Sequence, residues 1–424
     1  MIQPKLYNLS NGIPVIIDSL ETSESLCAGV YIKTGSRNET RPRDFGVSHL
    51  LEHMAFKGTA TRGANDITVP IENVGGNINA YTGYSMTSYH ATVPKAHREL
   101  VLDILSDIVQ NPSFPAAEFE REKMVVAQEL RAYEDMPDAV LENRACAAIF
   151  RGGMQHDIGG TEATVMAMTR DNVADFFRAR YGAADSVLVL SGGGISDHGR
   201  VLAELEKYFG AWGGCGECKY DASSYVTALS HTRRSELSHT YFKIVWPSRP
   251  AILRNELADQ NMFLTVLGSG FGSRLFQEIR EKRGLVYGIG AGGMFFEDVG
   301  IAAIEAQTEK TKMDQTVRAV AELVRAIKNG DAPLTAEELS RAKEMTKGGM
   351  LLGLETPTRR ADYFAARSIH YGGIDNMAEN VAAIENVTLD QANAAARELF
   401  SVKPSVITLG VEHELPLAGW QELF

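Results

Sequence analysis

Apolar residues recur every three to four positions in several long segments of the chain, a spacing that predicts amphipathic helices. The clearest segment is 97–110, whose recurring apolar residues are Leu100, Val101, Ile104, Leu105 and Ile108. The pattern ends at Asn111 and Pro112, because proline cannot continue a helix. We therefore expect residues 97–110 to form a helix that buries one face.

Shorter apolar runs predict strands. Such runs occupy residues 28–33 and 241–246, and residues 77–81 and 88–93 form hairpin-like neighbours. Strands joined by a hairpin pair antiparallel. The mixture of elements therefore favours an α+β fold, in which an antiparallel-rich sheet packs with helices, over a doubly wound parallel sheet.

The two halves of the chain resemble each other at an offset of 219 to 220 residues. At this offset Arg121 falls on Arg341, and the apolar residues 186–188 fall on residues 405–407. Repetition of this kind predicts two homologous α/β-layer domains that arose by duplication.

The length of the chain also points to more than one domain. At 424 residues it exceeds the usual size of a single hydrophobic core. The stretch that begins at Gly210 is rich in glycine and lacks periodicity, which is typical of a linker. We expect an N-terminal domain over residues 1–212, a linker over 213–230 and a C-terminal domain over 231–424.

Composition excludes several classes of protein. With 44% hydrophobic and 23% charged residues, the chain is typical of a globular protein. A net charge of -12 argues against nucleic acid as a partner. No run reaches the roughly 18 to 20 apolar residues that span a bilayer, and the N-terminus lacks a signal-peptide core. We therefore expect a cytoplasmic protein with no membrane association.

The four cysteines do not form a disulfide framework. Cys27 and Cys146 are isolated and are expected to be buried thiols. Cys215 and Cys218 have the spacing of a redox pair or of half a zinc site. No second C-x-x-C completes a four-sulfur site, so this pair alone is a weak signal.

A candidate metal site lies in residues 45–57, which we expect to form a helix. At about 100° per residue, one face is apolar, and the opposite face carries His49, Glu52 and His53. Side chains at positions i and i+4 lie one above the other, so both imidazoles can bind one ion while the carboxylate projects beside it. Zinc lowers the pKa of a bound water, and an adjacent carboxylate accepts the proton. Glu52 fits that role.

Two histidines leave a catalytic zinc one protein ligand short. Residues 116–135 are expected to form a helix, with an apolar stripe that includes Phe119 and Tyr133. Glu122 and Glu129 flank this stripe on the same side, because residues seven positions apart differ in direction by only about 20°. Either glutamate can complete the site, and spacing alone does not choose between the ligand role and an exposed surface charge.

The motif His49-Leu50-Leu51-Glu52-His53 is an inverted zinc-binding motif of the H-x-x-E-H type. The surrounding residues 46–59 closely resemble the signature of the pitrilysin or insulinase type of zinc peptidase, and particularly its processing-peptidase branch. In that family the third ligand is a glutamate some 76 residues beyond the second histidine, which implies Glu129. The resemblance assigns Glu122 to the residues that orient the ligands.

The resemblance also implies a substrate site. Asn79, Ala80 and Tyr81 are similar to the edge strand that holds substrate as an added β-strand. Arg280 and Tyr287 match the family's substrate-contacting pair, which can donate hydrogen bonds near the scissile bond. The second half has no H-x-x-E-H motif, which implies that the C-terminal domain acts as a substrate clamp.

In that family four such domains enclose a chamber, and a chain of this length supplies two of them. The resemblance therefore implies one half of a clamshell, completed by dimerisation. Because this chain carries both the zinc motif and the clamp pair, a homodimer is expected, with a heterodimer with a related subunit as the alternative. The clamp residues at one zinc ion then come from the same chain or from its partner.

These observations predict a zinc endopeptidase with one Zn²⁺ per chain that hydrolyses extended peptides or unstructured, presequence-like segments. One alternative is a non-catalytic subunit that only forms a chamber or scaffold, although such subunits usually lose motif residues. Another is a structural zinc protein, in which Cys215 or Cys218 would have to supply a fourth ligand.

Overall fold

Six strands form a first sheet in the order β1-β2-β7-β3-β5-β4. Its strands are β1 (Lys5–Asn8), β2 (Pro14–Ser19), β3 (Ser25–Ile32), β4 (Asn77–Thr82), β5 (Thr87–Pro94) and β7 (Ser186–Gly192). β2 and β7 are parallel, and the other neighbouring pairs are antiparallel. The structure is a computed structural model that describes residues 3–216, 220–251, 257–374, 376–411 and 416–424.

The hairpin predicted from residues 77–81 and 88–93 is present as β4 and β5. These strands pair antiparallel, with Asn79 opposite His90. β4 is the terminal strand of the sheet, so its outer edge has no strand neighbour among the described residues.

Several helices of the first half, among them α1, α2 and α3, pack on this sheet. α3 (Arg98–Gln110) confirms the helix predicted over residues 97–110, and its side chains Val101, Ile104, Leu105 and Ile108 are buried in the core. The other helices of this half are α1 (Val47–Ala55), α2 (Ala64–Asn73), α4 (Ala116–Glu134), α5 (Pro137–Ile149), α6 (Glu162–Ala167), α7 (Arg170–Arg180) and α8 (His198–Phe209).

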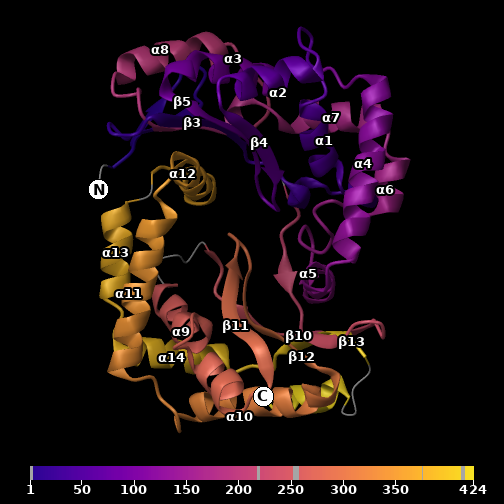
Figure 1. Ribbon diagram of the computed structural model, residues 1–424, viewed down its shortest axis with the longest axis vertical. Coiled ribbons are helices and arrows are strands. Elements are labelled where there is room, and N and C mark those ends of the chain that lie inside the picture. Colours follow the sequence, from indigo (N-terminus) through magenta and orange to yellow (C-terminus); the bar gives the residue numbers. More distant parts are fainter. Residues whose placement is uncertain (1–2, 217–219, 252–256, 375, 412–415) are drawn as a thin grey trace. The chain divides into compact units, whose positions relative to one another are not determined.

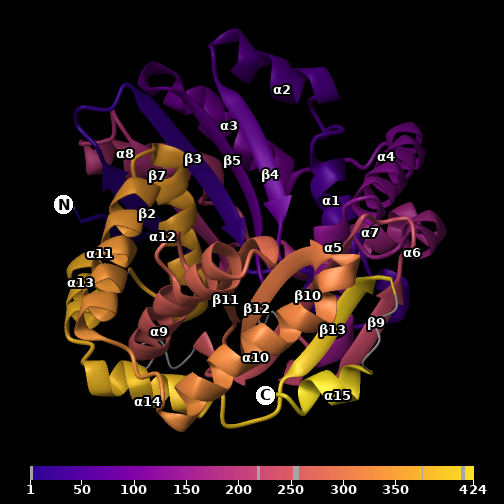
Figure 2. The same cartoon turned by 60° about the horizontal axis from the view of Figure 1, so that its bottom comes forward.

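A second sheet contains five strands in the order β11-β12-β10-β13-β9, which Figure 2 shows side by side. They are β9 (Leu229–Arg233), β10 (His239–Ser248), β11 (Val286–Phe295), β12 (Gly300–Glu309) and β13 (Ser405–Gly410). β13 and β9 are parallel, and the other pairs are antiparallel. The strands β4, β5, β3, β7 and β2 have the same order and directions in the first sheet, which supports duplication.

The second half adds further helices, and a short ribbon pairs one strand from each half of the sequence. Its helices are α9 (Ala258–Gly268), the π-helical turn η6 (Phe276–Lys282), α10 (Met313–Asn329), α11 (Ala336–Gly353), α12 (Pro357–Tyr371), α13 (Met377–Glu385), α14 (Leu389–Leu399) and α15 (Leu417–Gln421). β6 (Phe150–Arg151) pairs with β8 (Ser224–Tyr225). Helices and an antiparallel-rich sheet therefore occur in both halves, as the sequence predicted.

Packing divides the chain into two units, and each unit contains a helix from the other half of the sequence. The first unit comprises Met1–Ala132, His156–Asp221 and Leu351–Asn376, and the second comprises Tyr133–Gln155, Ala222–Met350 and Met377–Phe424. These units differ from the continuous domains expected over residues 1–212 and 231–424.

These two helices are α12, in the first unit, and α5, in the second unit. In the first unit, α12 lies against β3 and β7, which Figures 1 and 2 label between them, and its Phe364 and Ile369 are buried there with Val189. In the second unit, α5 packs on β10 and β13. Helical periodicity reveals that α12 has an apolar face, but it does not reveal which sheet covers that face.

The expected linker over residues 213–230 is only partly irregular. Strand β8 lies inside it, and β9 begins at Leu229. Their short lengths give too little alternation for strand prediction. Cys27 and Cys146 are buried, as predicted, and Cys215 is half-buried. Cys218 lies outside the described residues.

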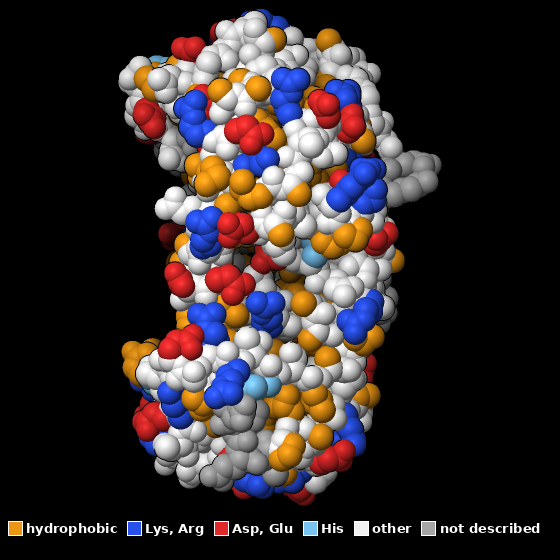
Figure 3. All heavy atoms as spheres, turned by 90° about the vertical axis from the view of Figure 1, so that its right-hand side faces the viewer, with side chains coloured by type: hydrophobic (Ala, Val, Ile, Leu, Met, Phe, Trp, Pro, Cys, Tyr) orange, Lys and Arg blue, Asp and Glu red, His pale blue; other side chains and the backbone are white. Residues whose placement is uncertain are grey.

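None of the helices in the described ranges is both long and apolar enough to cross a membrane. On the face of the molecule drawn in Figure 3, Lys and Arg side chains alternate with Asp and Glu side chains. That face therefore lacks a broad patch of only positive or only negative charge.

Candidate metal centre

Helix α1 supplies two histidines and a glutamate. It spans Val47–Ala55, within the range 45–57 predicted from the sequence. One face is buried in the core of the first unit through Val47, Leu50, Leu51 and Met54. Burial of that apolar face turns His49, Glu52 and His53 to the opposite side, as the periodicity predicted.

The N-terminus of α1 is held by a residue that sequence reasoning missed. The carboxylate of Glu39 accepts hydrogen bonds from the backbone N–H groups of Gly46 and Ser48, each at 2.8 Å. It thereby satisfies two of the N–H groups that a helix leaves without intrahelical partners. Burial raises the pKa of the Glu39 carboxyl to about 8. An acidic residue seven positions before Gly46 carries no recognisable capping signature.

Gly46 allows close packing at the same helix end. Its φ of 95° lies in the left-handed region, which favours glycine. A Cβ atom at this position would also lie 2.4 Å from the carbonyl oxygen of Gly159. Both conditions select glycine at this position, three residues before His49.

Helix α4 brings its two glutamates to α1. Glu122 is buried, and the Glu129 side chain is 32% exposed. Phe119 and Val126 are buried on the predicted apolar stripe, but Tyr133 is 44% exposed. The prediction for Tyr133 was therefore wrong, because this residue lies in the last turn, beyond the buried part of the helix.

The structure brings His49, His53 and Glu129 together. One ligand atom from each residue lies within 4.8 Å of the others. The Oε2 atom of Glu129 is 3.8 Å from His49 Nε2 and 3.5 Å from His53 Nε2. Bonds of about 2.0–2.2 Å to a tetrahedral zinc place ligand atoms roughly 3.3–3.6 Å apart. The donor set and its spacing therefore fit a zinc ion.

A chain of charged groups orients His53. Its Nδ1 atom is 3.0 Å from Glu122 Oε2, and the other oxygen of Glu122 is 2.7 Å from Lys57 Nζ. Burial lowers the pKa of His53, but hydrogen bonds with Glu122 and Glu129 outweigh this effect and raise the pKa to about 9. With Nδ1 engaged by Glu122, Nε2 faces Glu129.

His49 has a different environment. Burial lowers its pKa to about 4, and the neighbouring His53 contributes in the same direction. Its Nδ1 atom is buried and has no hydrogen-bond partner among the described residues. The ring is therefore neutral near pH 7, the form in which imidazole binds a metal ion.

Glu52 lies beside the three candidate ligands, and its carboxylate accepts a hydrogen bond from strand β4. Its Oε2 atom accepts a hydrogen bond of 2.7 Å from the hydroxyl of Thr82, the last residue of β4. Burial raises the pKa of the Glu52 carboxyl, and the hydrogen bond from Thr82 opposes that shift.

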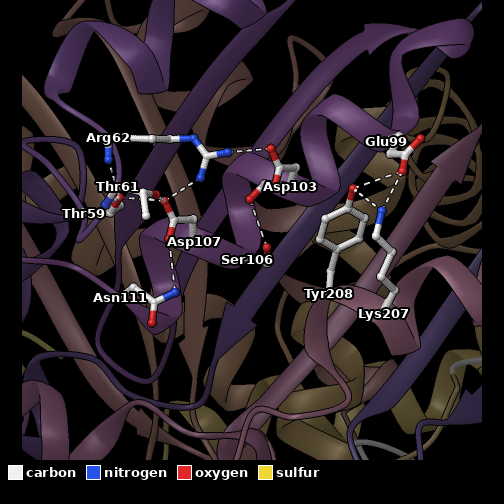
Figure 4. Close-up of polar contacts among 10 residues, drawn as sticks. All are labelled: Thr59, Thr61, Arg62, Glu99, Asp103, Ser106, Asp107, Asn111, Lys207 and Tyr208. Carbon is white, nitrogen blue, oxygen red and sulfur yellow. Dashed lines mark hydrogen bonds and ion pairs between the residues drawn. The ribbon is translucent and has the colours of Figure 1, made fainter.

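The loop after α1 is fixed to helix α3. Figure 4 shows Arg62 directed at both Asp103 and Asp107, while Thr59 donates to Asp107 at 2.6 Å. Because Lys57 immediately precedes this loop, the network restrains the backbone that carries the lysine.

Comparison with known proteins identifies the family. A family model described as insulinase (peptidase family M16) matches residues 14–162, and one described as peptidase M16 inactive domain matches residues 167–346. The uncharacterized zinc protease YmxG of Bacillus subtilis is 30% identical over 417 residues, which cover 97% of this chain and 99% of that protein. This chain belongs to peptidase family M16.

Other similarities agree with membership of M16. The uncharacterized zinc protease ML0855 of Mycobacterium leprae is 31% identical over 413 residues, covering 95% of this chain and 90% of that protein. The crystal structure of a protease from Helicobacter pylori shares the fold, with a TM-score of 0.86 at 20% identity over 96% of this chain and 100% of that chain. The family resemblance seen in the sequence is confirmed, and both of these bacterial relatives are named zinc proteases.

The strand that the M16 resemblance assigns to substrate is an edge strand. On β4, Asn79 and Tyr81 are exposed, whereas Ile78 and Ala80 are half-buried against the core. The backbone N–H of Ala80 donates to the side chain of Asn79 at 2.9 Å. The Asn79 side chain therefore satisfies this donor locally.

The second unit of this M16 chain contains the other predicted pair. The guanidinium of Arg280 lies 5.1 Å from the ring centroid of Tyr287 and 4.5 Å from that of Phe276. Tyr287 is 78% exposed. The structure therefore brings Arg280 and Tyr287 together and leaves the phenol accessible.

Proposed function

We propose that this chain is an active zinc endopeptidase that hydrolyses extended peptides or unstructured segments. The observation that carries the proposal is the cluster of His49, His53 and Glu129, with the Glu52 carboxylate beside it. Membership of family M16 supports the same chemistry. We further propose one zinc ion per chain, held by these three side chains.

The protein residues have distinct roles in this reaction. A bound zinc ion would supply Lewis acidity and make water a stronger acid. Glu52 accepts a proton from the attacking water and donates it to the leaving amine nitrogen. Glu122 holds His53 through Nδ1, so that the Nε2 atom stays directed at the ligand cluster.

Substrate binding is proposed at β4. An extended peptide adds to the outer edge of β4, at Asn79, Ala80 and Tyr81, through main-chain hydrogen bonds, which favours unfolded chains over folded proteins. Arg280 and Tyr287 are proposed to donate hydrogen bonds to peptide carbonyls, from the same chain or from a partner. We propose a homodimer, with a heterodimer with a related subunit as the alternative.

The variant Glu52→Gln tests the mechanism. It should retain one zinc ion per chain and lose cleavage of a quenched fluorescent peptide, because an amide cannot accept the proton. Glu118→Gln is a matched control on α4, since Glu118 pairs only with the exposed Arg121 in the described structure. Full cleavage by Glu52→Gln would refute the assigned mechanism. A wild-type protein that binds zinc but cleaves no peptide would favour the non-catalytic subunit.

A further inference from the structure

Thr82 connects the edge strand β4 to the candidate general base. Along this strand Ile78, Ala80 and Thr82 are half-buried, while the residues between them are exposed. This alternation turns the Thr82 side chain towards the face that packs near α1. Its hydroxyl then reaches Glu52 Oε2 at 2.7 Å.

The hydrogen bond restrains one side of the carboxylate. Within the described structure, Thr82 donates the one side-chain hydrogen bond that Glu52 accepts. A glutamate side chain has several rotatable bonds, and fixing one oxygen reduces its freedom to leave the site. The other oxygen remains available for proton transfer.

We expect the contact to contribute little to the stability of the strand. Thr82 is only half-buried, so water can replace the partner of its hydroxyl group. Its main-chain position is set by pairing with Thr87 on β5. Valine has the same branching at Cβ and an equally strong preference for strands.

We infer that Thr82 is a positioning residue that holds the Glu52 carboxylate through its hydroxyl and couples it to the substrate-binding strand. The inference rests on the proposed function. An extended peptide added to β4 runs beside the strand that ends at Thr82. The strand that aligns the peptide thus also holds the base, which favours substrates that pair with β4 as a strand.

Three variants distinguish the effect of the Thr82 hydroxyl group from the effect of the shape of its side chain. We expect Thr82→Val to lower kcat about tenfold, with KM and zinc content within about twofold of wild type. Thr82→Ser keeps the hydroxyl and should restore most of kcat. Thr92→Val is the matched control, because Thr92 lies on β5 and its hydroxyl contacts Thr358 instead of Glu52. This control should behave as wild type.

A second measurement does not depend on activity. The dissociation constant of a labelled peptide is measured by fluorescence anisotropy with Glu52→Gln and with the double variant Glu52→Gln/Thr82→Val. If Thr82 acts through Glu52, the two constants should agree within about twofold. Weaker peptide binding by the double variant would show that Thr82 acts on substrate, which overturns the inference.

Three further outcomes would contradict the inference about Thr82. Wild-type kcat in Thr82→Val, or equal losses in Thr82→Val and Thr82→Ser, overturns the role of the hydroxyl while the proposed function stands. Absence of cleavage by zinc-loaded wild-type protein overturns the proposed function and this inference together.

Discussion

Arg360 on α12 donates two hydrogen bonds to Asp18 on β2, at 2.6 and 2.7 Å, across 342 residues of sequence. Asp18 is fully buried and also accepts a hydrogen bond from Ser191. A helix from the second half of the chain thus neutralises a charge inside the first unit. The ion pair fixes α12 to a sheet formed by distant residues.

Replacement of Arg360 by Met should destabilise the first unit by about 3–5 kcal/mol, because it leaves the buried carboxylate of Asp18 without its partner. Denaturant-induced unfolding measures the change. The double variant Asp18→Asn/Arg360→Met should recover part of the loss, since the unpaired charge is removed. An unchanged midpoint in Arg360→Met would contradict a stabilising role for this pair.

The two glutamates of α4 should differ in their effect on zinc affinity. Glu129→Gln removes a proposed ligand and should weaken zinc binding more than a hundredfold. Glu122→Gln acts through His53 and should weaken it about 10- to 100-fold. Competition with a chromophoric chelator measures both affinities. A larger loss in Glu122→Gln than in Glu129→Gln would reverse the assignment of the third ligand.

Zinc binding should depend on pH through His53. In the zinc-free protein the pKa of His53 is about 9 and that of His49 about 4, so near pH 7 the incoming ion must displace a proton from His53 alone. The apparent affinity should therefore rise about tenfold per pH unit and become constant above about pH 9. Chelator competition between pH 6.5 and 9.5 tests this slope.

The control for the pH dependence is Glu122→Gln. It weakens the hydrogen bond that raises the pKa of His53, so the affinity should become constant at a lower pH. An affinity that does not change with pH in the wild-type protein would show that His53 is already neutral before zinc binds.

Lys57 should affect zinc retention although it contacts none of the three proposed ligands directly. Its ammonium group holds one oxygen of the buried Glu122 and leaves the other for His53. Lys57→Met should therefore release zinc about tenfold faster, whereas Lys57→Arg should retain most of the effect by donating to the same carboxylate. Stopped-flow transfer of zinc to a chelator measures the rate.

The control for Lys57 is Lys33→Met, which removes an exposed lysine from the same unit. Zinc release at the wild-type rate is expected in this control. Equal rates in Lys57→Met and wild-type protein would show that Glu122 keeps its orientation without the lysine.

Local sequence patterns alone predict the elements that carry the site. Helical spacing predicted α1 and α3, and the positions of His49 and His53 followed from their separation by one turn. The hairpin of β4 and β5 was also predictable, because its alternation and turn are local. Local patterns suffice here because each element's own residues define its apolar face.

Which elements contact one another is visible only in the folded protein. Nothing in the spacing of α12 indicated that its apolar face belongs on the first sheet, since any apolar surface of suitable size can cover it. The contacts of Glu39, Lys57 and Thr82 were likewise hidden, because hydrogen-bond partners depend on distance in space and direction. The periodicity of the sequence gives neither the distance nor the direction between residues on different elements.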